Sequence, residues 1–96
     1  MEACPAGYEA QFRQRRLQMY SDLAERLPQV IPPLSFSLIG GGELLRVANP
    51  VSGRFTVVLT TEVSNQAGRV WGYFWHGGGQ AWQADEAARR LAWCLA

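Results

Sequence analysis

The chain contains no lysine, because all nine of its basic residues are arginine. Schiff-base enzymes, pyridoxal enzymes and Walker A nucleotide sites each need an ammonium group. Guanidinium cannot replace that group, since it keeps its proton and does not act as a compact point charge. The sequence therefore excludes these three kinds of site.

Cysteine and histidine are scarce, with only Cys4, Cys94 and His76 in the chain. A zinc site needs three or four ligands at close spacing, and the sequence has neither a C-x-x-C nor an H-x-x-x-H pair. It also lacks the G-x-S-x-G turn that presents a nucleophilic serine. We therefore expect no metal and no cofactor and assign no catalytic residue. Two cysteines do not make a disulfide framework, and Cys94 is expected as a small buried apolar residue of a helix.

Long hydrophobic runs and an excess of one charge are also missing. The first residues include Glu2, where a secretion signal has positive charge, and no apolar segment follows. The least charged run, 28–42, is broken by proline and glycine and is too short to span a bilayer. A net charge of +1 gives no broad field toward nucleic acid or an anionic membrane. These features predict a cytoplasmic protein without a membrane partner and weigh against nucleic acid.

The composition that remains is that of a folding chain. Its 96 residues are 48% apolar and 18% charged, which is too hydrophobic for disorder and enough for one core. We expect one domain over residues 1–96, with a frayed end at 1–7.

Periodicity predicts the secondary structure. Apolar residues at a spacing of 3.6 indicate a helix over 8–27 that Pro28 ends, and an alanine-rich stripe indicates a second helix over 84–95. Strand-like runs occupy 35–39, 43–48, 54–63 and 69–76. The expected fold is α+β: an N-terminal amphipathic helix, an antiparallel meander of three to four strands, and a C-terminal helix packed on the sheet. In the strand 54–63, we expect Phe55, Val57, Leu59 and Thr61 to face the core.

The strand 69–76 is the most informative segment, because both of its faces are apolar. Trp71, Tyr73 and Trp75 alternate on one face, and Phe74 lies on the other. A two-layer domain leaves one face of its sheet exposed, and an exposed apolar patch marks a binding surface. The sequence does not decide which face is the core. The alternative is that helices bury both faces, with Trp82 and Trp93 in the core.

The interface interpretation assigns contacts to the first of these faces. It comprises Trp71, Tyr73 and Trp75 with Arg69 beside them, since tryptophan, tyrosine and arginine are enriched at interface hot spots. Arg16 projects from the apolar stripe of the first helix, where it either extends to water, forms a pair or marks a contact. The predicted function is a non-enzymatic protein-interaction module that forms a homodimer or serves as a small subunit or adaptor.

Two alternatives stay open. One is a small-molecule or accessory enzyme site near His76, walled by Trp75, Trp82 and the glycines 77–79. The other is single-stranded nucleic acid stacked on an aromatic sheet face, with charge from Arg13, Arg15 and Arg16.

Three segments carry a resemblance to known proteins. The runs 45–50 (LRVANP), 71–75 (WGYFW) and 84–86 (ADE) resemble a pattern in short uncharacterised actinobacterial proteins with α-β-β-β-α order, over roughly the last 55 residues. That resemblance implies no activity. The element order is also similar, at the level of fold, to small dimeric chaperones of type III secretion, which implies a chaperone-like binder of extended protein segments.

Overall fold

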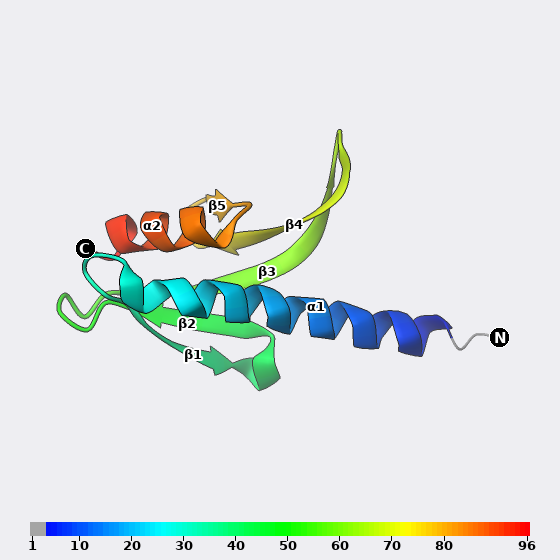
Figure 1. The fold of residues 1–96 in the computed structure, drawn as a ribbon, viewed down its shortest axis with the longest axis horizontal. Helices are drawn as coiled ribbons and strands as arrows, with labels where there is room; N and C mark the ends of the chain where they lie inside the picture. Colours follow the sequence, from blue (N-terminus) through cyan, green and yellow to red (C-terminus); the bar gives the residue numbers. More distant parts are fainter. Residues whose placement is uncertain (1–3) are drawn as a thin grey trace.

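A computed structural model describes residues 4–96 of the chain (Figure 1). Helix α1 (Cys4–Arg26) begins before the expected start at Tyr8 and includes residues 4–7 of the expected frayed end. Residues 1–3 of the expected frayed end lie outside the described part. A short 3-10 helix η1 (Leu27–Gln29) follows α1, with Pro28 inside it.

The sheet has five strands, one or two more than expected. The strands are β1 (Ser35–Ile39), β2 (Leu44–Ala48), β3 (Phe55–Asn65), β4 (Gly68–Trp75) and β5 (Gly79–Ala81). All neighbours pair antiparallel in the order β1-β2-β3-β4-β5. A 3-10 turn, η2 (Gly40–Gly42), joins β1 to β2. The extra strand β5 forms because Gly77 and Gly78 adopt positive φ angles, which lets the chain reverse directly after β4.

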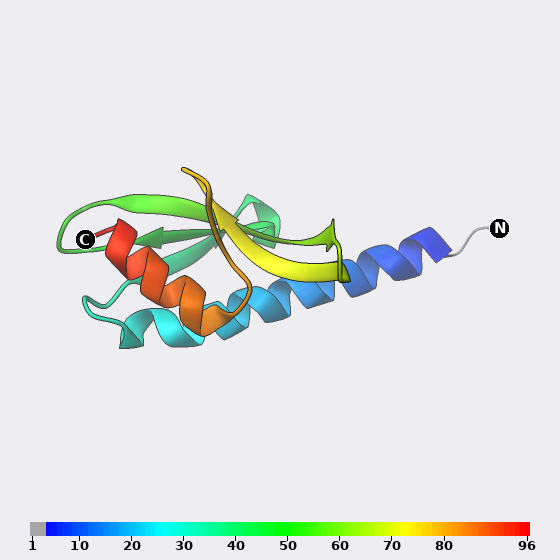
Figure 2. The ribbon, with the colours of Figure 1, turned by 90° about the horizontal axis from the view of Figure 1, so that it is seen from above.

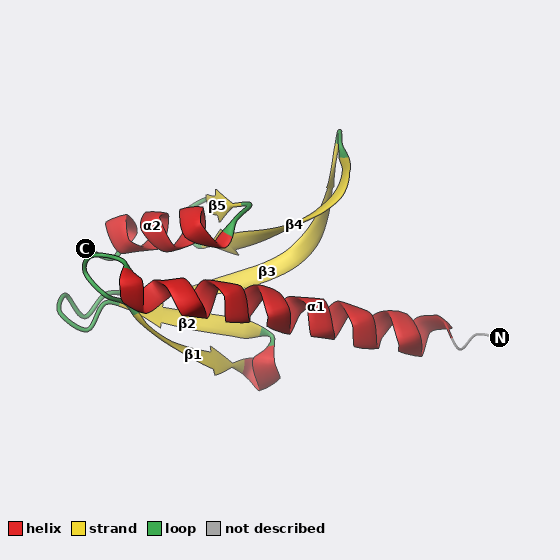
Figure 3. Cartoon of the chain, in the orientation of Figure 1, coloured by secondary structure: helices red, strands yellow, loops and turns green. Residues whose placement is uncertain are grey.

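The helices form a second layer on one face of this meander. Helix α2 (Ala84–Cys94) lies beside α1, and Figure 2 shows both helices below the sheet. Figure 3 colours the helices and the strands separately, and their order along the chain makes this an α+β fold as expected. The core between the layers contains Leu23 and Leu27 of α1, Leu45 and Val58 of the sheet, and Leu91 of α2.

The alternation in β3 is the reverse of the expected one. Val58 and Thr60 are buried under the helices, whereas Phe55 is exposed. The expectation that Phe55, Val57, Leu59 and Thr61 face the core is therefore wrong. Thr60 can be buried because its Oγ1 donates to the Gly72 carbonyl at 2.8 Å, which satisfies the hydroxyl.

The two helices are joined to each other and to the sheet by polar contacts. Arg26 of α1 forms an ion pair with Asp85 in the first turn of α2.

None of the helices in residues 4–96 is long and apolar enough to cross a bilayer.

Candidate interaction surface

The aromatic face expected as an interface is largely core. Tyr73 is 1% exposed and Trp75 is 8% exposed. The Tyr73 hydroxyl donates to the Met19 carbonyl of α1 at 2.7 Å. Burial raises the Tyr73 pKa to about 12, because the anion would be poorly solvated there. The assignment of these two residues to a contact surface is wrong, since this face of β4 meets the helix layer.

The other predicted contact residues lie at the margin of that core. Trp71 is partly buried against Phe12, with ring centroids 4.8 Å apart. Arg16 donates from Nε to the Thr60 carbonyl at 3.0 Å and lies over the Phe12 ring, so it is paired within the chain. Arg69 is exposed near the tip of the β3–β4 hairpin, 3.7 Å from a Glu62 oxygen. Of the five, only Arg69 is freely accessible.

The residues of the predicted small-molecule site lie on different faces of the sheet. His76 is exposed in the turn after β4. The Trp75 ring lies against Gly79 on the helix side, while the Trp82 ring lies over Gly72 on the other side. These two indoles therefore do not form opposite walls of one pocket beside His76.

The sheet face opposite the helices is apolar. We call it the open sheet face, and it carries Leu44, Arg46, Phe55, Val57, Leu59, Thr61, Val63, Val70, Phe74 and Trp82. Phe55 is 55% exposed and Trp82 is 43% exposed, and the aliphatic residues of β3 between them are half-buried. No element of residues 4–96 lies over this face, so its apolar side chains cover one another only in part.

A compact aromatic group forms one end of the open sheet face. The Trp82 ring packs edge-on to Phe74, with centroids 5.9 Å apart. It also covers Gly72 so closely that a Cβ at that position would lie 2.7 Å from the indole. Glycine at position 72 is thus required for Trp82 to lie flat on the sheet. No sequence pattern predicts this contact, because only the pairing of β5 with β4 brings Trp82 over Gly72.

The other end of the open sheet face carries a positive charge. The Arg46 guanidinium lies over the Phe55 ring, 4.3 Å from its centroid. This stacking holds an arginine flat beside exposed apolar surface, an arrangement typical of interface hot spots. The arginines expected to help bind nucleic acid, at positions 13, 15 and 16, lie on α1 in the opposite layer.

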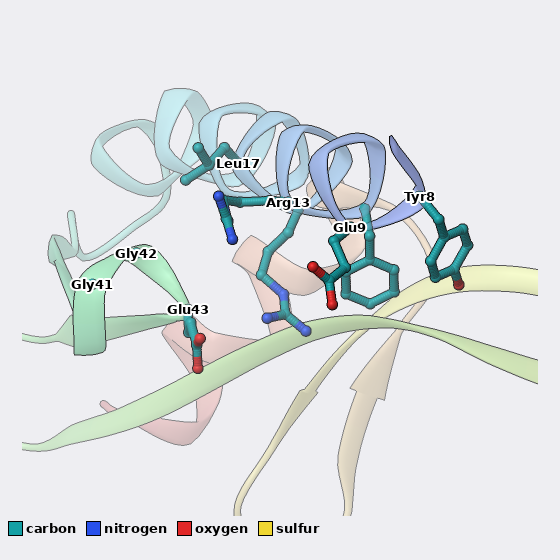
Figure 4. Close-up of a pocket in the computed structure, with 9 residues that line it drawn as sticks. Tyr8, Glu9, Arg13, Leu17, Gly41, Gly42 and Glu43 are labelled. Atoms are coloured by element: carbon teal, nitrogen blue, oxygen red, sulfur yellow. The ribbon is translucent and has the colours of Figure 1, made fainter. Parts of the chain in front are cut away.

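The hollows outside the open sheet face include three of about 310 to 450 Å³. One of about 310 Å³ between α1 and η2 has a partly charged lining, because Glu9, Arg13, Arg16 and Glu43 contribute to it; Figure 4 shows Glu9 extending from α1 toward the sheet. A second, of about 390 Å³, is an apolar groove between α1 and β1. The third, of about 450 Å³, lies beside Trp93.

Helix α2 differs from expectation on its outer side. Trp93 is 84% exposed and Cys94 is also exposed, whereas a buried Cys94 and a core Trp93 were among the expectations. The alanine stripe is on the inner side, as predicted, and includes Ala87, Ala88 and Ala92. The small alanines let α2 approach the sheet, and this leaves the larger Trp93 on the far side.

Within residues 4–96, no three histidine, cysteine or acidic side chains lie close enough to hold a metal ion. Comparison with protein-family models, with curated proteins and with solved structures finds no match to this chain, so the resemblance to actinobacterial and secretion-chaperone proteins stays a prediction.

Proposed function

We propose that this protein is an interaction module that binds another protein through the open sheet face. One observation carries the proposal: a five-stranded sheet with both helices on one side leaves the aromatic and aliphatic residues of the other side partly exposed. A sheet normally buries one face in the core and keeps the other polar. Here the second face is apolar as well, and an exposed apolar face of this kind supports a binding role.

The chemistry of the face suggests its partner. Phe55, Phe74 and Trp82 provide large apolar contacts at the two ends, and β3 provides β-branched and aliphatic residues between them. Arg46 is the one charged side chain on the face, and it is held against Phe55. A matching partner therefore presents an apolar surface, such as one stripe of an amphipathic helix, with an acidic residue opposite Arg46.

Site-specific photo-crosslinking in cells of the source organism tests this proposal. A photoreactive phenylalanine analogue replaces Phe55 in one variant, Trp82 in a second and Trp93 in a control. Trp93 is a suitable control because it is more exposed than either but lies on the helix layer. We expect one protein to be cross-linked from positions 55 and 82 and not from 93.

The captured protein is then purified and its binding measured directly. Phe55→Asp should weaken binding by about tenfold or more, since a carboxylate would be desolvated in the contact, and Trp93→Asp should not change it. Circular dichroism checks that both variants are folded. Equal cross-linking from all three positions, adducts only with a second copy of this chain, or no adduct from positions 55 and 82 would each contradict the proposal.

A further inference from the structure

Strand β1 is an unprotected edge of the sheet. It lies at the outer margin of the meander, next to α1 (Figure 1). Proteins usually protect an edge strand with charge, proline, a bulge or a covering segment. The sequence of β1, SFSLI, has no charge and no proline, its pairing with β2 is regular, and four of its five residues are exposed. Such an edge can accept a further strand.

The register shows which backbone groups this edge offers. The Asn49 N–H donates to the Arg54 carbonyl at 2.8 Å, and hydrogen-bonded pairs alternate along antiparallel strands. Residues 45 and 47 of β2 therefore bond to β3, and residues 44, 46 and 48 bond to β1. On β1 the inward-bonding residues are then 35, 37 and 39. The N–H and C=O groups of Phe36 and Leu38 point outward, without a partner strand in residues 4–96.

On either side of these two residues, the chain already uses one backbone hydrogen-bonding group. The Leu34 N–H donates to the Leu27 carbonyl at 3.0 Å, and the Gly40 carbonyl accepts from the Glu43 N–H at 3.4 Å. The free edge therefore has two defined ends, and its outward hydrogen-bonding groups belong to Phe36 and Leu38.

An apolar groove adjoins this edge. It has a volume of about 390 Å³ between β1 and α1, and uncharged residues line it: Leu17, Tyr20, Ser21, Ala24, Phe36, Ser37, Leu38 and Leu45. Phe36 is 44% exposed and Leu38 is 50% exposed on the groove side. A strand added at β1 would extend over this groove and place alternate side chains into it.

We propose that the strand added at β1 is β1 of a second copy, which makes a symmetric dimer with one continuous sheet. A two-fold axis at Ser37 places Phe36 of each copy opposite Leu38 of the other. Each of these pairs exchanges two hydrogen bonds, so the outward N–H and C=O groups of both residues are satisfied in both copies. Shifting the register by two residues would instead place Leu34 or Gly40 opposite one of them, and the Leu34 N–H and the Gly40 carbonyl already have partners within the chain.

Side-chain chemistry agrees with this register. Phe36 and Leu38 lie on the same side of the strand, so the four apolar side chains of a dimer would form one cluster over the two grooves. Ser37 would meet Ser37 of the second copy in a non-hydrogen-bonded pair, where strands approach most closely and small side chains fit. The net charge of +1 per copy gives little repulsion. Five-residue strands make a small contact, so we expect a dimer that dissociates on dilution.

A matched pair of cysteine variants tests whether the two-fold axis of the dimer lies at Ser37. Ser37→Cys and Ser35→Cys are made in a Cys4→Ser/Cys94→Ser background, which removes the native thiols. The two cysteines at position 37 would have Cα atoms about 4.5 Å apart, within the range for a disulfide. The two at position 35 would be about 14 Å apart along the strands, since four residues separate them. We expect Ser37→Cys to form a covalent dimer about tenfold faster under mild oxidation.

Light scattering over a range of concentrations provides the second measurement. The mass of the wild type should rise toward that of a dimer, Leu38→Glu should stay monomeric, and Trp93→Glu should behave as wild type. Leu38→Glu must retain its monomer circular dichroism spectrum. Equal cross-linking rates at positions 35 and 37, or a wild type that is monomeric at millimolar concentration, would overturn the dimer. Because β1 and the open sheet face are different surfaces, neither result bears on the cross-links from positions 55 and 82.

Discussion

The buried tyrosines carry the polar contacts between α1 and the sheet. The Tyr20 hydroxyl accepts from the Thr60 N–H at 3.1 Å and lies within hydrogen-bond distance of the Glu43 and Val58 carbonyls. The Tyr73 hydroxyl donates to the Met19 carbonyl. Burial raises the pKa of both hydroxyls. Each phenol fills the apolar core with its ring and supplies a backbone partner with its oxygen.

These shifts predict unfolding at alkaline pH. Tyr73 has a pKa of about 12 in the folded chain, raised chiefly by burial, against 10.0 when unperturbed. A group that holds its proton more tightly in the folded state contributes stability below its unfolded pKa. It loses that contribution as the pH rises through the folded pKa. We therefore expect the unfolding free energy to fall between about pH 10 and 12.

Tyrosinate absorbance and circular dichroism, followed together, measure this effect. The wild type should show a late ionisation step that coincides with loss of structure, and Tyr73→Phe should remove part of that step. If every tyrosine ionises near pH 10 while the circular dichroism spectrum stays unchanged, Tyr73 is not buried as described.

At the scale of elements, the loop between β2 and β3 anchors the end of α2. Asn49 is buried and donates from Nδ2 to the Leu95 carbonyl at 3.0 Å, and the Ser52 hydroxyl donates to the same carbonyl at 2.7 Å. The Asn49 Oδ1 accepts from the Val51 N–H at 2.9 Å, which holds the loop itself. The Asn49 side-chain amide thus provides a donor for a carbonyl at the end of α2 and an acceptor within the β2–β3 loop.

Replacing this amide should loosen α2 from the sheet. Asn49→Ala leaves the Val51 N–H without its Oδ1 acceptor and removes a buried donor from Leu95, which should cost about 1–3 kcal/mol of unfolding free energy. Ser52→Ala should cost less, about 0.5–1.5 kcal/mol, because Asn49 still donates to Leu95. Urea denaturation measures both. Equal losses of unfolding free energy for the two substitutions would show that the contact of Asn49 with the Val51 N–H adds no stability.

At the scale of the whole molecule, the position of the helix layer decides which aromatic residues are core. Trp75 and Tyr73 are buried because α1 and α2 lie over their face of β4, and Trp93 is exposed because it is on the outer side of α2. Long α1 extends the molecule to 52 × 30 × 21 Å, and its Phe12 packs on Trp71 of the β3–β4 hairpin. The result is a thin two-layer structure with one apolar face left open.

Two tryptophan substitutions test whether Trp75 lies in the core and Trp93 on the surface. Trp75→Ala should lower the unfolding free energy by about 3–5 kcal/mol, because it leaves a large cavity under the helices. Trp93→Ala should change it by no more than about 0.5 kcal/mol. Thermal denaturation of the two variants beside the wild type provides the measurement. Similar losses for both would place Trp93 in the core and contradict the layer order.

The sequence by itself determined most of the elements, because their signals are local. Hydrophobic spacing and Pro28 predicted the first helix to within a few residues of its end, and the alanine stripe of α2 is on the inner side as expected. The α+β class follows from the same periodicities. The short strand β5 was missed, since three residues beside a run of glycines carry too little pattern to distinguish strand from loop.

Tertiary structure alone decided which face of the sheet is covered. A strand with two apolar faces is equally compatible with a helix layer on either side. The alternation of side chains around Phe55 in β3 and around Trp71 in β4 therefore could not show which face the helices cover. The choice depends on contacts distant in sequence, such as Tyr20 with Thr60 and Tyr73 with Met19. Those contacts bury the predicted aromatic face, leave the open sheet face exposed, and place the free edge of β1 beside an apolar groove.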